Sequence, residues 1–181
     1  MSPLLLVLVL VVVAGAIFAV TQLDRSPKSA DVAGNIRHAI SQSGLKDVST
    51  SQDREKGVVT LGGHVTSDND KLRAESIARS VAGQQVISNQ IEVLPPGLES
   101  DARKVNSALD KGISSNMEAA LIQYNLHDVK YSVKNHVITL TGDVDTQELR
   151  SKAETVAAAM PNVEQVVNEI QVRVQRATTT R

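Results

Sequence analysis

The chain has 181 residues and a formal net charge of −1, so it lacks the excess of cations with which nucleic-acid-binding proteins contact phosphates. Aromatic residues make up 2% of the chain, too few for a base-stacking platform or an aromatic-walled ligand pocket. Cysteine is absent, which excludes disulfides, thiolate nucleophiles and cysteine-ligated zinc or iron–sulfur sites.

Residues 1–23 predict a transmembrane anchor or a signal peptide. Every residue from Pro3 to Val20 is apolar or glycine, a length at the lower limit for a helix that spans a bilayer. The tripeptide Ala14-Gly15-Ala16 fits a signal-peptide cleavage site. An ordinary signal peptide has Lys or Arg before its apolar run, and this chain has neither there, so we favour an uncleaved anchor. The apolar run is followed by Arg25, Lys28 and Arg37, so a positive-inside count would place the residues after the run in the cytoplasm. Charge alone therefore leaves the membrane orientation open.

An internal duplication fills most of the remaining sequence. Residues 58–93 align with residues 137–172 without a gap. The match continues upstream after a length difference in one turn, where such a difference is tolerated. Two copies of one small module are therefore expected, at residues 29–94 and 113–173. The identical pairs include Val58/Val137, Leu61/Leu140, Gly63/Gly142, Ala74/Ala153, Glu75/Glu154, Asn89/Asn168, Ile91/Ile170 and Val93/Val172.

Each copy predicts the element order α-β-β-α-β. The first helix has an apolar face at helical spacing, and a β-branched strand, residues 58–65 or 137–144, forms a hairpin with the strand before it. A second helix is capped near Ser67 or Thr146, and a closing strand alternates apolar and polar residues. We expect an α+β fold of two tandem modules, each a three-stranded mixed sheet with two helices on one face. The polar residues 174–181 predict a disordered tail.

Residues 95–112 predict a linker that contains a helix. Pro95-Pro96-Gly97 breaks regular structure, and residues 101–109 again have helical spacing. We interpret them as an extra helix, or as an extension of the next helix that is interrupted at Gly112. A capping box at residues 115–118 predicts the start of the helix that belongs to the second module.

The strand-glycine-strand, helix and closing-strand pattern resembles the BON domain, named for bacterial osmotically induced and nodulation proteins. Together the two copies cover roughly residues 30–173. The first copy matches with Val59-Thr60-Leu61-Gly62-Gly63-His64-Val65 and Asn89-Gln90-Ile91-Glu92-Val93, and the second with residues 137–144 and 163–172. Gly63 and Gly142 are expected at a bulge or strand exit that needs φ > 0, and Asn89 and Asn168 are expected to hydrogen-bond a neighbouring loop.

The resemblance implies an exported bacterial envelope protein whose domains associate with phospholipid surfaces and support membrane integrity under stress. Members with two copies are often soluble in the periplasm or held by a lipid on cysteine. Because this chain has no cysteine, its N-terminal segment would tether it to the inner membrane. We therefore expect a periplasmic or extracytoplasmic location and an anionic phospholipid surface as partner. The alternative is a protein-interaction or chaperone-like module that binds envelope proteins.

The residues do not assemble into a catalytic or metal site, and the family resemblance implies no catalytic residues. Glu75 and Glu154 recur at equivalent helix positions, where we expect them to be solvated or paired with Arg79 or Lys152. We predict no enzyme activity, cofactor, bound metal or small-molecule substrate. No metal-ligand spacing relates the four histidines, His38, His64, His127 and His136.

A lipid-contacting surface needs an exposed apolar edge with flanking cations. The region around the start of the second module fits this need best. The competing interpretation places Met117 and Tyr124 in the core. Because Asp110 and Glu118 dilute the positive charge, the affinity should be weak and tethering should matter. The predicted lipid-binding residues are Lys104, Lys111, Ile113, Met117 and Tyr124.

Overall fold

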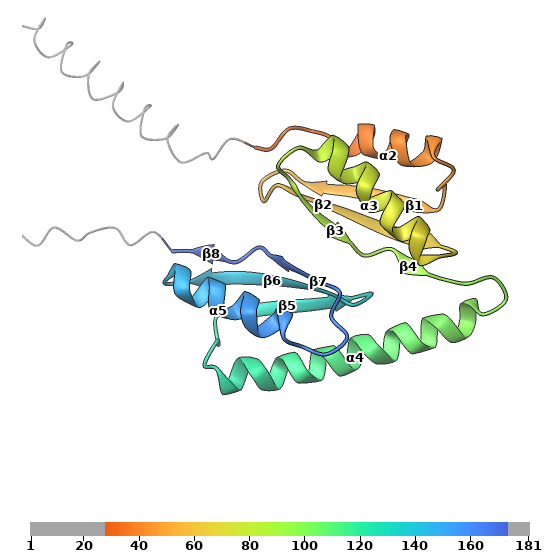
Figure 1. Ribbon diagram of the computed structural model, residues 1–181. Coiled ribbons are helices and arrows are strands. Elements are labelled where there is room, and N and C mark those ends of the chain that lie inside the picture. The colour runs from red at the N-terminus through yellow and green to blue at the C-terminus, as the bar shows by residue number, and fades with distance from the viewer. Residues whose placement is uncertain (1–27, 174–181) are drawn as a thin grey trace, which may run out of the picture.

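The computed structural model describes residues 28–173, in which a long helix connects two similar modules (Figure 1). The predicted anchor or signal peptide at residues 1–23 and the predicted tail at 174–181 lie outside the described residues. No helix within residues 28–173 has both the length and the apolar character that a bilayer span needs.

The two modules repeat the same elements in the same order. The first contains α2 (Ala33–Gln42), β1 (Val48–Asp53), β2 (Val58–Val65), α3 (Asp68–Ala82), β3 (Val86–Asn89) and β4 (Glu92–Val93). The second contains α4 (Glu99–Gln123), β5 (Val129–Lys134), β6 (Val137–Val144), α5 (Gln147–Ala158), β7 (Gln165–Asn168) and β8 (Gln171–Val172).

Each sheet is mixed, with its longest strand at the centre. β2 pairs antiparallel with β1 and parallel with both β3 and β4, and β6 pairs in the same way with β5, β7 and β8. The parallel pairs follow from the crossover helix between β2 and β3. The α+β fold with two sheet-and-helix modules agrees with the sequence prediction. The sequence pattern predicts the closing strand as one piece, whereas the structure divides it into two short strands in both modules.

Both helices of each module pack on one face of its sheet. In β2, Val59 and Leu61 point into the core, while Val58 points to the opposite face, because successive side chains of a strand alternate. A fully buried aliphatic side chain of this kind contributes about 1.5–3 kcal/mol. The first core is built from Ile36, Ile40, Val59, Leu61, Ala74, Ala78, Ile87 and Ile91, and the second from Ile113, Met117, Leu121, Ile138, Leu140, Ala153, Ala157 and Ile170.

Helix α4 is continuous, which contradicts the predicted interruption at Gly112 and the predicted helix start at residues 115–118. Its N-cap is Leu98, and no side chain caps it. Glycine in a helix costs only about 1 kcal/mol relative to alanine. Burial of Ile113 and Met117 on the same stripe offsets that cost. The helix therefore runs from the linker into the second module without a break.

The other predicted helix boundaries are confirmed. Ser67 and Thr146 cap α3 and α5, where their hydroxyl oxygens accept hydrogen bonds from the backbone N–H groups of Asp70 and Leu149 at 3.2 and 3.3 Å. Each cap satisfies a donor that the first helical turn leaves unpaired. Gly44 follows the C-cap residue Ser43 of α2 and has φ +90°, as predicted for a glycine at a helix C-terminus.

Candidate functional site

Gly63 and Gly142 occupy equivalent positions near the ends of the central strands β2 and β6. Their φ angles are +86° and +119°, in the region that side chains rarely adopt. At Gly63 a Cβ atom would overlap the carbonyl oxygen of Asp47, and at Gly142 it would overlap that of Asp128. The two glycines therefore let the neighbouring strand approach closely, and their role is structural.

Asn89 and Asn168 hold the break between the two halves of the closing strand. The Asn89 Oδ1 atom accepts from the Ile91 N–H at 3.4 Å, and its Nδ2 group donates to Glu75 Oε2 at 2.9 Å and to the Lys71 carbonyl at 3.3 Å. The Ile91 N–H lies in the short segment between β3 and β4, and the bonds to helix α3 come in addition to the neighbouring-loop contact that the sequence predicted. The same bonds recur in the second module, where Asn168 contacts Glu154, Arg150 and Ile170.

Glu75 lies between this asparagine and a cation of its own helix. Its Oε1 atom accepts from Arg79 Nη2 at 2.6 Å, which is the local pairing expected from the sequence. Burial by itself raises the pKa of Glu75, but hydrogen bonds from Asn89 and Arg79 outweigh it and hold the pKa below its ordinary value. Glu75 is therefore an ionised structural group rather than a proton donor.

The two modules meet along β3 and β7. The Gln165 side chain accepts from the Asn89 N–H at 2.9 Å and donates to the Ile87 carbonyl at 2.6 Å, so that it pairs the edge of β3 as another peptide group would. Lys56 Nζ contacts Glu169 at 2.6 Å across the same boundary. Val58, Val137 and Val167 form a small buried cluster between the uncovered sheet faces.

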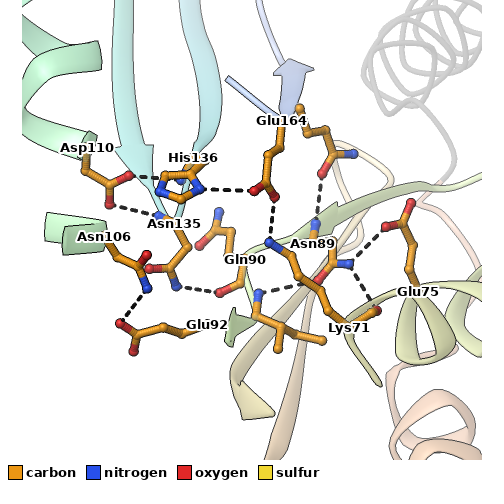
Figure 2. Close-up of polar contacts among 12 residues, drawn as sticks. Lys71, Glu75, Asn89, Gln90, Glu92, Asn106, Asp110, Asn135, His136 and Glu164 are labelled. Atoms are coloured by element: carbon orange, nitrogen blue, oxygen red, sulfur yellow. Dashed lines mark hydrogen bonds and ion pairs between the residues drawn. The ribbon is translucent and has the colours of Figure 1, made fainter. Parts of the chain in front are cut away.

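A bridge of three side chains crosses the boundary beside this cluster (Figure 2). Glu164 accepts from Lys71 Nζ of the first module at 2.7 Å and lies 3.1 Å from His136 Nδ1 of the second. Burial tends to raise the pKa of Glu164, but the hydrogen bonds from Lys71 and His136 and the charge of Lys71 outweigh it. The net result is a pKa below the ordinary value of 4.5.

The depressed pKa of Glu164 makes the contact between the modules sensitive to acid. Its stabilising contribution is fully present above about pH 4.5 and is lost as pH falls through the lower pKa of the folded state. Because Glu164 is half exposed, we expect Glu164→Gln to cost less than about 1 kcal/mol at neutral pH and nothing at about pH 2. Thermal unfolding midpoints at both pH values measure this difference. A Glu118→Gln variant, exposed on α4, is the control, and a cost that persists unchanged in acid would contradict the assignment.

The structure separates the five residues predicted to contact lipid. Ile113 is 1% exposed and Met117 is fully buried, so both belong to the core of the second module and neither is available to a membrane surface. The alternative interpretation of Met117 as a core residue is the correct one. The helical spacing that identified these two residues marks the face of α4 that packs on β5 and β6.

The remaining three predicted residues are exposed but lie far apart along α4. Lys104 pairs with Asp101 at 3.2 Å, and Lys111 lines an open polar groove of about 600 Å³ beside the first module. Tyr124 is 41% exposed at the other end of the helix. From Lys111 to Tyr124 the helix rises about 20 Å, so these residues do not form one site.

Tyr124 instead lies at an apolar groove of about 390 Å³ between the end of α4 and helix α5. The ammonium group of Lys152 lies 5.4 Å from the centre of the Tyr124 ring and donates to the Tyr124 carbonyl at 3.2 Å. The sequence analysis missed this groove, because its walls come from segments about 30 residues apart. Its lining residues are Tyr124, Lys152, Thr155, Val156, Ala159 and Met160.

The first module has the same architecture at this place but different side chains. Arg73 takes the position of Lys152 and donates to the Ser43 carbonyl at 3.5 Å, as Lys152 does to that of Tyr124. Ser43 replaces the tyrosine, and Ser76 replaces Thr155. The aromatic wall is therefore specific to the second module, and the duplication could have revealed this difference from sequence alone.

Residues 28–173 contain no group of three or more His, Asp or Glu side chains placed to hold a metal ion. Among the histidines, His38 bonds Gln42 on its own helix at 2.9 Å, and His136 takes part in the bridge between the modules. The repeated carboxylates Glu75 and Glu154 each bond an asparagine of their own module. The polar clusters described here thus have structural partners.

Comparison with known proteins extends these observations. Osmotically-inducible protein Y of Escherichia coli (strain K12) is 27% identical over 135 residues, which is 71% of this chain and 64% of the relative. The chain therefore spans less than two thirds of that protein. Two structures of CdsD, a structural protein of the type III secretion system of Chlamydia trachomatis, are 14% identical, with TM-scores of 0.32. They cover 79% and 78% of this chain, and 66% and 62% of the CdsD chains.

The family comparison covers both modules. The model of the BON domain matches residues 28–95 and again residues 103–174. The two matches together include every helix and strand of the two sheets, apart from the first residues of α4. Gly63 and Asn89 lie inside the first match, and the equivalent Gly142 and Asn168 lie inside the second. The chain belongs to the BON domain family and carries two copies of the domain.

Proposed function

We propose that this protein is a non-catalytic component of the bacterial envelope that binds anionic phospholipid surfaces through its second BON domain. The observation that carries the proposal is the groove between α4 and α5, where Tyr124, an apolar floor and the Lys152 ammonium group lie together at the surface. A tyrosine with a nearby lysine suits the boundary between acyl chains and headgroups. The apolar segment at residues 3–20, which we propose tethers the chain to the inner membrane, supports the same location.

The groove supplies two kinds of interaction with a lipid. Ala159 and Met160 offer apolar surface to the upper part of an acyl chain, above the buried Val156, and Tyr124 lies at the rim. Lys152 would contact a headgroup phosphate, an interaction worth about 1 kcal/mol for a lysine near an anionic surface. A single cation gives weak binding, so tethering the domain near the bilayer would raise its occupancy.

The test places one polarity-sensitive fluorophore in each module. Since the chain has no cysteine, Thr155→Cys labels the groove of the second module and Ser76→Cys labels the matching position of the first. The full chain is reconstituted in vesicles of phosphatidylcholine with or without phosphatidylglycerol. We expect a blue shift at position 155 that requires the anionic lipid and weakens in high salt, and no shift at position 76.

A pair of matched charge reversals identifies the headgroup contact. Lys152→Glu should lower the lipid response at position 155 about tenfold, since two units of charge change beside the groove. Arg73→Glu makes the same change in the first module and should leave that response intact. Equal responses at both labels, or a response at position 155 that ignores lipid charge, would reject the proposal.

A further inference from the structure

Each sheet has one outer strand whose free edge pairs with no other strand of the described chain. These strands are β1 in the first module and β5 in the second. The opposite edges, β3 and β7, meet where the two modules contact each other. A free edge presents backbone N–H and C=O groups with which another extended chain can pair. Because the two free edges are equivalent parts of a duplicated module, they can be compared residue by residue.

The first module covers its free edge. The Arg37 guanidinium group donates to the outward-facing Thr50 carbonyl of β1 at 3.1 Å. Directly after β1, the Arg54 carbonyl accepts from the Ser29 N–H at 2.9 Å, and Arg54 Nε donates to the Ser29 carbonyl at 2.8 Å. An arginine of α2 and the segment before that helix therefore obstruct the addition of a strand to β1.

The free edge of β5 lacks this cover. The turn of two residues after β5 closes Lys134 against Val137, so the backbone groups of Tyr131 and Val133 point away from β6. No backbone group elsewhere in residues 28–173 bonds them. In this module Glu118 takes the position of the arginine that caps β1, and an ionised carboxylate cannot donate to a carbonyl.

The open polar groove of about 600 Å³ lies along this edge. Val133 and Asn135 line it from the β5 hairpin, and Lys111, Ser114 and Ser115 line it from α4. A groove between a helix and an unpaired strand edge is a common place for an extended peptide to bind, since the edge supplies backbone hydrogen bonds and the groove receives alternate side chains.

The charges on β5 favour an acidic partner. Lys130, Ser132 and Lys134 are exposed in one row on the face away from the helices. Neither lysine has an ion pair within residues 28–173. Asp143, the exposed acidic residue of β6 on that face, lies beyond the end of β5. A second copy of β5, paired antiparallel about Ser132, would set Lys130 opposite Lys134, and like charges directly opposite are destabilising.

We propose that the free edge of β5 binds an extended, acidic segment of another protein by antiparallel strand addition. Acidic residues four positions apart in that segment lie against Lys130 and Lys134, and the residue midway between them lies beside Ser132. A lipid headgroup has no row of backbone groups to offer this edge, whereas a peptide has. The site is separate from the groove between the end of α4 and α5, so the inference goes beyond the proposed lipid-binding function.

Binding of a labelled peptide of seven residues tests the charge pattern. The peptide has Asp at its second and sixth positions, Ser at its fourth, and Thr or Val elsewhere, and its fluorescence anisotropy is followed as the full chain in phosphatidylcholine nanodiscs is added. We expect binding that Lys130→Glu with Lys134→Glu weakens at least about tenfold. The control, Lys28→Glu with Lys46→Glu, makes the same change in net charge in the first module and should leave the affinity unchanged. No binding, or equal effects of the two pairs, would contradict the proposal.

Backbone methylation of the peptide separates strand pairing from charge attraction. In the antiparallel pair the third and fifth peptide N–H groups face β5, and the second and fourth face away. N-methylation at the third and fifth positions should abolish binding, whereas N-methylation at the second and fourth should preserve it. If the two methylated peptides bind alike, no strand is added and the proposal is wrong. It is also wrong if the Lys130→Glu and Lys134→Glu pair reduces the lipid response at position 155 and leaves peptide binding intact, since the occupant is then a membrane.

Discussion

Replacement of Gly142 by alanine is expected to lower the free energy of unfolding of the second module by about 3 kcal/mol or more. A residue with a side chain pays about 1–2 kcal/mol for a positive φ angle. The new methyl group would also overlap the Asp128 carbonyl oxygen, and a forced shift of a packed backbone costs about 1–3 kcal/mol more. The carbonyl belongs to the chain that enters β5, so the methyl group would push β5 away from β6. Urea unfolding followed by circular dichroism measures the change.

Two further glycine substitutions separate the causes. Gly63→Ala should destabilise the first module to a similar extent, because its Cβ atom would meet the Asp47 carbonyl oxygen. Gly44→Ala should cost only about 1–2 kcal/mol, since Gly44 has φ +90° but no atom lies within 4 Å of the place its Cβ would take. If Gly44→Ala and Gly142→Ala cost the same, close approach of the strands is not the cause.

Asn89→Ala should cost about 2–4 kcal/mol, the second largest effect that we expect. Asn89 is 4% exposed, and its loss leaves the Ile91 N–H and one oxygen of Glu75 without their partner. A buried group left unsatisfied costs about 1–3 kcal/mol, and more if it is charged. Asn168→Ala removes the same bonds from a less buried site, so its cost should be smaller. Chemical denaturation of both variants gives the comparison.

A double-mutant cycle isolates the bond between Asn89 and Glu75. Glu75→Ala and Asn89→Ala together should cost at least about 1 kcal/mol less than the sum of the single changes. Asn89→Asp keeps the acceptor for the Ile91 N–H but places a second carboxylate against Glu75. That variant should be destabilised at neutral pH and recover in part as either carboxylate is protonated. Additive effects of the two alanine substitutions would show that the contact carries no energy.

The sequence predicted the elements of each module well because their determinants are local and occur twice. Gly63, Gly142, Asn89 and Asn168 stand out by recurrence at equivalent positions, and each occupies a backbone geometry or hydrogen bond that few other residues satisfy. The helix caps at Ser67 and Thr146 likewise depend on only a few consecutive residues.

Features that depend on distant parts of the chain were not predictable from local pattern. The local sequence predicts a helix interruption at Gly112, yet α4 continues because Ile113 and Met117 pack on the sheet of the second module. The groove at Tyr124 needs helix α5 as its second wall. Helical spacing also could not say which apolar face of α4 is buried and which is exposed, so the predicted lipid-binding set mixed core and surface residues.

Gln165 has a consequence for the newly made protein. Its side chain pairs the free edge of β3, but it is translated well after β3 itself. Until the ribosome has added that part of the second module, the first module emerges with an open strand edge of the kind that recruits other nascent chains. The edge of β3 therefore stays unpaired by Gln165 while residues 95–164 are being added.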